Sequence, residues 1–441
     1  MTETKQGSGS AKKFAGIDIP PDLTWSNFFN LYLATFFVSC LLVLPAVVQP
    51  ALLKEVINIP DEQAGSINAG LQNMHYVATL LFIGLIGMLS DKIGRRIFAI
   101  IGFAVCGIFY VLFGYTQDIS LALGITSVGG QVLVTYIFRF LIGMGLILCY
   151  PQFITLVADY TYERDRGKGM ALNGVMMGVG SIIVFGILAQ IARKTGLMSL
   201  FYMAGALGFL GVMVSGLWLV DRMPQEKPKA LGIKEFYTIV SKSLALKVGY
   251  VTKLVVGPDT SITGTFLILW MVYVAEKSGI SPLKATAKGG VVLMVMGLVS
   301  FAAFPVIGVL LDRWSRVSVI ASGLIVGGLG FCGAGLTGDP FSPPMYLFFS
   351  FVGIGVAAGL TGSNTLVSDV SPKNLLGSIL GGLNSMRPIG VLFFLQVGGF
   401  LFDNVGYGAP FLLKGIASVV CGLWVFSVRK NVNVMRENLS R

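Results

Sequence analysis

The feature that most constrains this chain is a series of long apolar runs separated by short polar stretches. A helix needs about 20 apolar residues to cross the hydrocarbon core of a bilayer, and each run is long enough. The runs lie near 25–52, 65–89, 94–115, 131–158, 168–192, 197–220, 247–275, 287–311, 317–337, 344–368, 377–402 and 408–428. With 54% of its residues apolar and only 12% charged, the chain lacks the polar surface that a soluble protein needs. The sequence therefore predicts an all-α membrane protein with twelve transmembrane helices.

Composition also excludes other classes of protein. The five cysteines form no C-x-x-C pair and His75 is the only histidine, so we expect no metal site, haem or disulfide scaffold. The sequence contains no nucleophile–base pair and no nucleotide-binding loop, which argues against an enzyme and against a bound cofactor. The net charge of +11 is better explained by membrane topology than by nucleic-acid binding.

The positions of the basic residues predict the topology. Of the 32 Lys and Arg residues, 22 lie in the two tails and the loops on their side, 6 lie in the opposite loops, and 4 lie within the spans. Lys and Arg concentrate on the cytoplasmic side of membrane proteins. We therefore expect both termini in the cytoplasm and a multi-pass protein of the plasma (inner) membrane. The first 24 residues contain no apolar core typical of a cleaved signal peptide, so the first run is itself expected to span the membrane.

The chain also repeats itself. Four residues recur 221 positions later: Gly87, Asp91, Lys92 and Arg95 correspond to Gly308, Asp312, Arg313 and Arg316. Five others recur 210 positions later: Gly143, Gly145, Asp159, Gly167 and Gly180 correspond to Gly353, Gly355, Asp369, Gly377 and Gly390. The repeat predicts two pseudo-symmetric six-helix bundles with a central site between them. The predicted units are an N-terminal tail (1–24), a bundle (25–220), a cytoplasmic linker (221–246), a second bundle (247–428) and a C-terminal tail (429–441).

Two motifs carry a family resemblance. The loop after the second run, Gly87-Met-Leu-Ser-Asp91-Lys92-Ile-Gly94-Arg95-Arg96, resembles the major facilitator superfamily signature G-x-x-x-D-[RK]-x-G-R-[RK]. Arg139-Phe-Leu-Ile-Gly143-Met-Gly145 resembles the R-x-x-x-G-x-G pattern of that family's fourth helix. With the span count and the repeat, the resemblance covers nearly the whole chain. The Gly-Pro pair of drug/proton antiporters and the P-E-S-P-R motif of sugar porters are absent, so no subfamily is identified.

The resemblance implies a gating role for the signature loop. Asp91 would lie near the N-terminus of the eleventh span, where the helix dipole favours a carboxylate, and Arg95 would pair with Asp159. Gly94 would permit the tight turn between the helices. These contacts would hold the halves together in the outward-facing state, and Asp312, Arg313 and Arg316 would act in the second copy. The alternative is that these charges only set the topology.

Charges inside the spans are costly and usually functional. The basic residues inside are Arg139, Lys253, Arg387 and Lys414, and the acidic one is Asp259. Arg387 lies about 16 Å into the eleventh span at 1.5 Å per residue, with Asn384 one turn earlier. An arginine there suits a carboxylate or a phosphate, unless it pairs structurally with Asp259. Arg139 is a second candidate for substrate contact or for a structural role. By resemblance, the cavity-lining spans add three more polar candidates: Tyr32, Thr263 and Asn364.

The seventh span contains a predicted break. Gly257-Pro258-Asp259 should interrupt the helix near its centre. Asp259 is then the first candidate for proton coupling, with pairing to a basic residue as the equal alternative. An unperturbed histidine titrates near neutral pH, so His75 is the second candidate, unless it is a hydrogen-bonded structural residue. Lys253 could reach the cytoplasm or face the cavity, and we expect Lys414 to extend outward.

Together these observations predict a secondary transporter that works by alternating access on a small organic anion such as a carboxylate. It would be a proton symporter or an anion exchanger, and it would act as a monomer. Its partners would be the anionic substrate, a coupling proton or counter-anion, and the lipid bilayer. One alternative is a carrier for a lipid, an amphiphile or a drug. Another, from a different class, is a membrane sensor that transports nothing.

Overall fold

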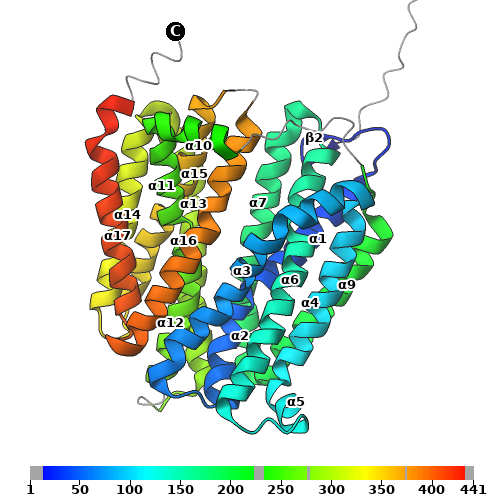
Figure 1. Cartoon of the computed structure of the whole chain (residues 1–441), viewed down its shortest axis with the longest axis vertical. Coiled ribbons are helices and arrows are strands. Elements are labelled where there is room, and N and C mark those ends of the chain that lie inside the picture. The colour runs from blue at the N-terminus through cyan, green and yellow to red at the C-terminus, as the bar shows by residue number, and fades with distance from the viewer. Residues whose placement is uncertain (1–12, 223–232, 276–278, 373–374, 433–441) are drawn as a thin grey trace, which may run out of the picture.

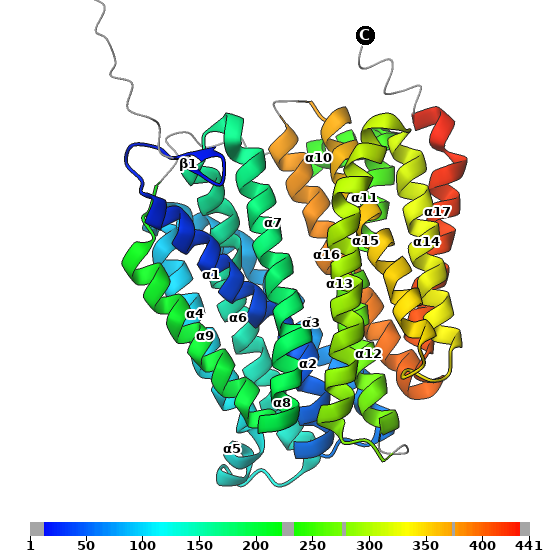
Figure 2. The ribbon, with the colours of Figure 1, turned by 180° about the vertical axis from the view of Figure 1, so that it is seen from behind.

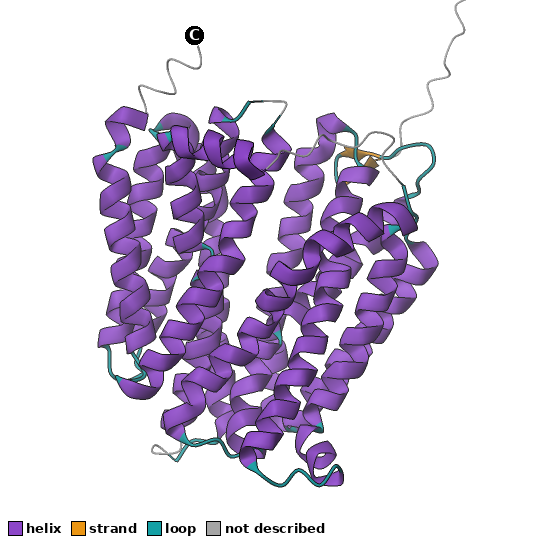
Figure 3. Ribbon diagram, in the orientation of Figure 1, coloured by secondary structure: helices purple, strands orange, loops and turns teal. Residues whose placement is uncertain are grey.

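The computed structural model describes residues 13–222, 233–275, 279–372 and 375–432. In this part of the chain, twelve helical segments are long and apolar enough to cross a membrane, which confirms the predicted number. They are Trp25–Val56, Asp61–Ile93, Arg95–Gly114, Val128–Tyr160, Arg166–Thr195, Leu197–Trp218, Leu244–Ala275, Pro282–Arg313, Arg316–Leu336, Pro344–Val370, Ser378–Asn404 and Ala409–Ser427. Nearly all of the described chain is helical (Figure 3).

The helices form two bundles that lie side by side (Figures 1 and 2). The first half contains α1 (Trp25–Val43), α2 (Pro45–Ala51), the π-helical turn Leu52–Val56, α3 (Asp61–Ile93), α4 (Arg95–Gly114), α5 (Thr116–Ala122), α6 (Val128–Tyr160), the 3-10 turn Glu163–Asp165, α7 (Arg166–Ile183), the π-helical turn Val184–Leu188, α8 (Ala189–Thr195) and α9 (Leu197–Trp218). The second half contains α11 (Leu244–Val256), α12 (Asp259–Ala275), α13 (Pro282–Arg313), α14 (Arg316–Leu336), α15 (Pro344–Val370), α16 (Leu376–Asn404) and α17 (Ala409–Ser427). Between them, α10 (Ile233–Lys242) lies in the predicted linker. Of that linker, 223–232 fall outside the described residues.

Both described chain ends lie at the same end of the molecule (Figure 1), which we call the tail face. The predicted polar tail contains one ordered element there, a hairpin of β1 (Lys13–Phe14) and β2 (Ile17–Asp18). Its turn residues both have positive φ, 47° at Ala15 and 79° at Gly16, as the two-residue turns of hairpins require. Arg164 forms an ion pair with Asp18 at 2.5 Å, and Lys168 donates to the Gly16 carbonyl at 3.1 Å. These contacts attach the hairpin to the loop between α6 and α7 and to the first turn of α7.

The two halves are joined at the face opposite the tail face. Asp403 at the end of α16 accepts hydrogen bonds from the backbone N–H groups of Gly65 (2.6 Å) and Ser66 (2.8 Å) on α3. Gly65 and Gly399 let the helices touch there, because a Cβ on either glycine would lie 2.7 Å from the carbonyl oxygen of the other. The Asn68 side chain also donates to the Thr265 carbonyl of the second half at 3.0 Å. This end of the molecule is closed.

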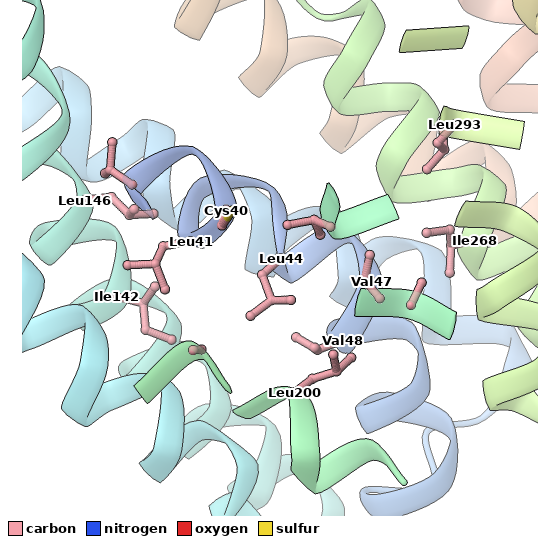
Figure 4. Packing of buried hydrophobic residues seen from close by; sticks show 14 of the residues in the cluster. Cys40, Leu41, Leu44, Val47, Val48, Ile142, Leu146, Leu200, Ile268 and Leu293 are labelled. Carbon is pink, nitrogen blue, oxygen red and sulfur yellow. The ribbon is translucent and has the colours of Figure 1, made fainter. Parts of the chain in front are cut away.

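Apolar packing continues the closure toward the middle of the molecule. Figure 4 shows that α1 and α2 pack between helices of both halves. The residues that pack together there are all buried: Cys40, Leu41, Leu44, Val47, Val48, Ile142, Leu146, Leu200, Ile268 and Leu293. Because this cluster contains side chains from the first half and from α12 and α13, the halves share one core at this level.

Toward the tail face the halves separate. The last polar contacts between them join Asn73 to the Leu392 carbonyl (3.4 Å) and Tyr76 to Ser261 (2.8 Å). The other hydrogen bonds that join the two halves among the described residues lie on the closed side of these contacts. From there α3 and α16 diverge (Figure 1), and α3 exposes Leu81 (62%). The structure is therefore open between the halves at the tail face.

The predicted break in the seventh span is present. α11 ends at Val256 and α12 begins at Asp259, with Gly257 and Pro258 between them. Proline lacks the N–H that would continue the helical ladder, and its ring clashes with the preceding turn. The break matters because α16 packs directly against it.

Candidate functional site

The signature loop is organised around Arg95 at the start of α4. Its side chain is buried and forms ion pairs with Asp159 of α6 and with Asp91 at 3.3 Å. The Arg95–Asp159 pair that the family resemblance implied is thus present. Gly94 has φ of +118°, which an L side chain rarely adopts. Nothing in the sequence indicated that Asp221 caps α4, yet its carboxylate accepts the N–H groups of Arg95 (2.7 Å) and the next residue (2.9 Å).

The second copy of the loop has the same arrangement of ion pairs, but its charged side chains are more exposed. Arg316 pairs with Asp369 and lies 3.9 Å from Asp312, whose side chain is exposed. Arg313 is exposed as well. The repeat found in the sequence therefore corresponds to two equivalent charge clusters, one in each half.

Asp91 does not lie near the N-terminus of the eleventh span, where the family resemblance placed it for a conformation closed at the tail face. Its ion-pair partner among the described residues is Arg95 on its own loop, and its side chain is 48% exposed. The end of α3 that carries Asp91 points away from α16 (Figure 1). The physical reason is the open tail face, which separates the two helices that the contact would join. Neither Gly87 nor Gly308 has an atom within 4 Å of the position a Cβ would take, so neither packs closely here.

Asp259 and Lys414 form a buried ion pair, and the expectation that Lys414 extends outward was wrong. The Lys414 ammonium lies 2.6 Å from the Asp259 carboxylate, and the two side chains are 0% and 4% exposed. Lys414 also donates to Ser418 at 2.6 Å and lies over the rings of Phe331 and Phe394. α17 turns this lysine inward, where an opposite charge and aromatic faces replace water. Asp259 therefore has its basic partner, and that partner is not Arg387.

We expect this pair to be essential for stability. Removing one member of a buried ion pair leaves the other uncompensated, at a cost of about 3–5 kcal/mol. Asp259→Asn and Lys414→Met should each lower the unfolding temperature of the purified protein in detergent, and the double variant should recover part of the loss. The exposed Asp118 of α5 offers a control, since Asp118→Asn should unfold like the wild type. Wild-type unfolding of Asp259→Asn would contradict the structural role.

Arg139 is held by neutral partners. Its Nε donates to Gln49 and one terminal nitrogen to Gln72, both at 2.9 Å, and its side chain is 1% exposed. The other terminal nitrogen has no hydrogen-bond partner among the described residues, and no acidic residue pairs with it there. Arg139 thus links α6 to α2 and α3 and keeps an uncompensated charge in the first half.

Two predicted substrate residues are engaged elsewhere. The Tyr32 hydroxyl donates to the Gly169 carbonyl at 3.2 Å, and the Thr263 hydroxyl donates to the Asp259 carbonyl one turn earlier at 2.7 Å. Both side chains are buried. In this conformation the structure does not bring them to the opening between the halves.

Arg387 lies where α16 meets the break in the seventh span. A Cβ on Gly257 would lie 2.9 Å from Arg387 Cγ and 3.0 Å from its Cα, and a Cβ on Gly390 would lie 2.2 Å from the Leu254 carbonyl oxygen. The two glycines thus let α16 rest on the interrupted helix. Arg387 is half-buried, and its Nε has no hydrogen-bond partner among the described residues. Asn384, one turn closer to the tail face, is exposed.

The surroundings of Arg387 come from both halves. Its charge interacts electrostatically with His75 of α3, Tyr150 of α6 and Lys253 of α11. The Nδ1 atom of His75 has no hydrogen-bond partner among the described residues. Lys253 is 6% exposed and donates to Asn364 at 3.2 Å, so it stays inside rather than reaching the tail face. Arg387 therefore lies within electrostatic range of ionisable groups from both halves.

Sequence reasoning missed Tyr150. It lies in a uniformly apolar stretch of the fourth span, and nothing in its spacing shows which face of the helix it occupies. In the part of the chain that the structure describes, no group of three or more His, Cys, Asp or Glu side chains could hold a metal ion.

The fold and the site define a class of protein. Two six-helix bundles, closed at one face and open at the other, enclose a basic centre halfway along, which is the arrangement of a secondary transporter. The family model of the Major Facilitator Superfamily matches residues 31–302 and 259–437, and the chain belongs to this family. It is a carrier and not an enzyme.

Individual relatives are similar to this chain over most of its length. The chain is 30% identical over 400 residues to magnetosome protein MamH of Paramagnetospirillum magneticum, covering 91% of this chain and 92% of the relative. It is 28% identical to magnetosome protein MamZ of Magnetospirillum gryphiswaldense, covering 92% of this chain but only 62% of that relative. It is 24% identical to multidrug resistance protein 1 of Bacillus subtilis, covering 89% of this chain and 92% of that protein.

Solved structures agree on the fold. A D-xylose–proton symporter matches with a TM-score of 0.68 at 18% identity, covering 90% of this chain and 97% of that one. The nucleoside transporter NupG matches with a TM-score of 0.66 at 14% identity, covering 91% and 98%. At these identities the likeness concerns the fold alone.

Proposed function

We propose that this transporter carries a small organic anion, such as a carboxylate, which binds to Arg387 between the two halves. The observation that supports the proposal is the unpartnered Arg387 Nε, half-buried beside the break in the seventh span. A guanidinium without an acidic partner inside a membrane protein is costly, and a carboxylate would satisfy it through charge-assisted hydrogen bonds.

The Asp259–Lys414 pair strengthens the case for an anion. Asp259 was the one acid inside the spans that could have compensated Arg387, and it is taken by Lys414 at 2.6 Å. A cationic substrate would need an accessible acid at the site. Among the described residues around Arg387 none is acidic, so a cation finds no counter-charge there.

The site bears on coupling as well. Because Asp259 is paired with Lys414, the remaining candidate for proton coupling is His75, whose Nδ1 has no hydrogen-bond partner among the described residues. Proton symport would use this imidazole, whereas anion exchange would need no titratable group. By the distribution of Lys and Arg, the tail face lies in the cytoplasm and the conformation is inward-facing. We place the protein in the inner membrane; the similarity to magnetosome proteins makes the magnetosome the alternative location.

The test is uptake into proteoliposomes that contain the purified protein. The proteoliposomes are offered a panel of labelled carboxylates, phosphates, sulfonates, amines and an amphiphilic drug. Each compound is tested with and without unlabelled anion inside the vesicles, and with and without an imposed pH gradient. We expect uptake of anions, driven by the pH gradient in symport or by internal anion in exchange. Uptake of amines or of the drug alone would contradict the proposal and favour a drug carrier. Absence of uptake for the whole panel would favour a sensor.

A further inference from the structure

The centre of the molecule holds more positive charge than one carboxylate would neutralise. Arg139, Lys253 and Arg387 lie inside the spans, and none of them has an acidic partner among the described residues. Lys414, the fourth basic residue inside, differs because Asp259 compensates it. Uncompensated charges are costly to bury, so a bound anion that supplies the missing negative charge would be favoured.

Two of these cationic residues, Lys253 and Arg387, lie next to the same break in the seventh span. The Gly257 N–H donates to the Lys253 carbonyl at 2.9 Å, which puts Lys253 one helical turn before the glycine. Arg387 rests on that same glycine. Lys253 is nine-tenths buried, and its neutral acceptor Asn364 is itself exposed, so the ammonium lies just behind an accessible amide. Arg139 is enclosed by glutamines in the other half and contributes charge rather than contact.

From this geometry we infer that the substrate carries at least two negative charges, one on Arg387 and one on Lys253 with Asn364. This rests on the proposed function, since it names the class of anion that the same site takes. A single carboxylate bound at Arg387 would leave the ammonium of Lys253, held only by the neutral amide of Asn364, without a counter-charge. A dicarboxylate, or a phosphate monoester with both charges on one group, neutralises both.

The position of Arg387 between the open tail face and the contacts that join the halves favours a short anion. The contacts of Asn73 and Tyr76 with the second half close the space on one side of Arg387, and Leu392 lies five residues, about 7–8 Å of helix, beyond it. Asn384, one turn closer to the tail face than Arg387, is exposed. We therefore expect a short, highly charged anion to enter from the open tail face and to bind before it reaches these contacts.

The test compares two carboxylic acids of equal chain length, butyrate with one charge and succinate with two, and adds glycerol 3-phosphate as the phosphate source of the same charge. Affinities are measured on the purified full-length protein by ligand-dependent unfolding, which rises with binding. We expect succinate or glycerol 3-phosphate to bind wild type at least tenfold more tightly than butyrate. Which of the two binds identifies the source of the charge.

Substitution of Lys253 locates the second charge. Lys253→Met should weaken dianion binding by about 10- to 150-fold, the loss of one charge-assisted contact, and should leave butyrate binding unchanged. Lys253→Arg keeps the charge and should keep the preference, which separates a binding role from a structural one. The matched control is Lys247→Met, because Lys247 is exposed on the same helix, and it should behave like the wild type.

Each contrary result has a different meaning. Equal affinity for butyrate and the dianions, or an unchanged preference in a well-folded Lys253→Met protein, overturns the dianion inference while an anion site remains. Failure of every anion to bind, with binding of an amine instead, overturns the proposed function itself.

Discussion

Replacing Arg387 with alanine should nearly abolish binding of the anionic substrate while the protein still folds. Arg387 has no hydrogen bond or ion pair among the described residues that would be lost with it, so its removal should relieve rather than damage the apo protein. Loss of the charge-assisted contact should lower affinity by about 10- to 150-fold. The measurement is substrate affinity by titration of the purified protein, with its unfolding temperature recorded alongside.

Two further variants sharpen this prediction. Arg387→Lys keeps the charge but loses the planar fork that matches a carboxylate, so it should bind with intermediate affinity. Arg193→Ala removes an exposed arginine near the opposite face and should bind like the wild type. Wild-type affinity in a folded Arg387→Ala protein would show that the substrate binds elsewhere.

Locking the closed face should stop transport without preventing binding. The carboxylate of Asp403 bridges to the N–H groups of Gly65 and Ser66, and alternating access requires this contact to open. We expect that a short bifunctional thiol reagent joining Ser66→Cys to Asp403→Cys abolishes uptake, while substrate still binds from the tail face. Uptake into proteoliposomes and substrate affinity are measured before and after cross-linking.

The background for this experiment is favourable because four of the five native cysteines are buried and Cys332 is half-buried. Cys332→Ser removes the accessible one, and each single-cysteine variant treated with the same reagent serves as a control. Undiminished uptake by the fully cross-linked protein would mean that the halves do not part at this face during transport.

The fold could be predicted from the sequence because its determinants are local or repeated. Hydropathy gave the twelve spans, and Pro258 gave the break between α11 and α12. The Arg95–Asp159 pair came from a family motif, and the repeat then indicated where its counterpart, Arg316 with Asp369, would lie.

The site could be predicted only in part because it depends on which face of each helix points inward. Helices that are apolar on every side do not show this in their sequence. Arg387 was identified because a charged side chain inside a membrane span is energetically costly whichever face of the helix carries it. The ion-pair partners of the charged residues could not be predicted. Lys414 and Asp259 lie far apart in the chain, and nothing in the local sequence shows that both point inward. Tyr32 and Thr263 were polar residues on the expected spans, yet their hydroxyls bond to helix carbonyls. Tyr150 was overlooked for the same reason.

The central claim, that an anion occupies the space beside Arg387, can be tested at one position. Asn384 is exposed and lies three residues before Arg387, on the same face of α16. A thiol at Asn384→Cys, in the Cys332→Ser background, therefore reports on that space. The measurement is the rate at which a thiol reagent labels this cysteine with and without the transported anion. The account predicts that the anion slows labelling, that an amine of similar size does not, and that Arg387→Ala removes the protection. Labelling at an unchanged rate in the presence of saturating anion would contradict it.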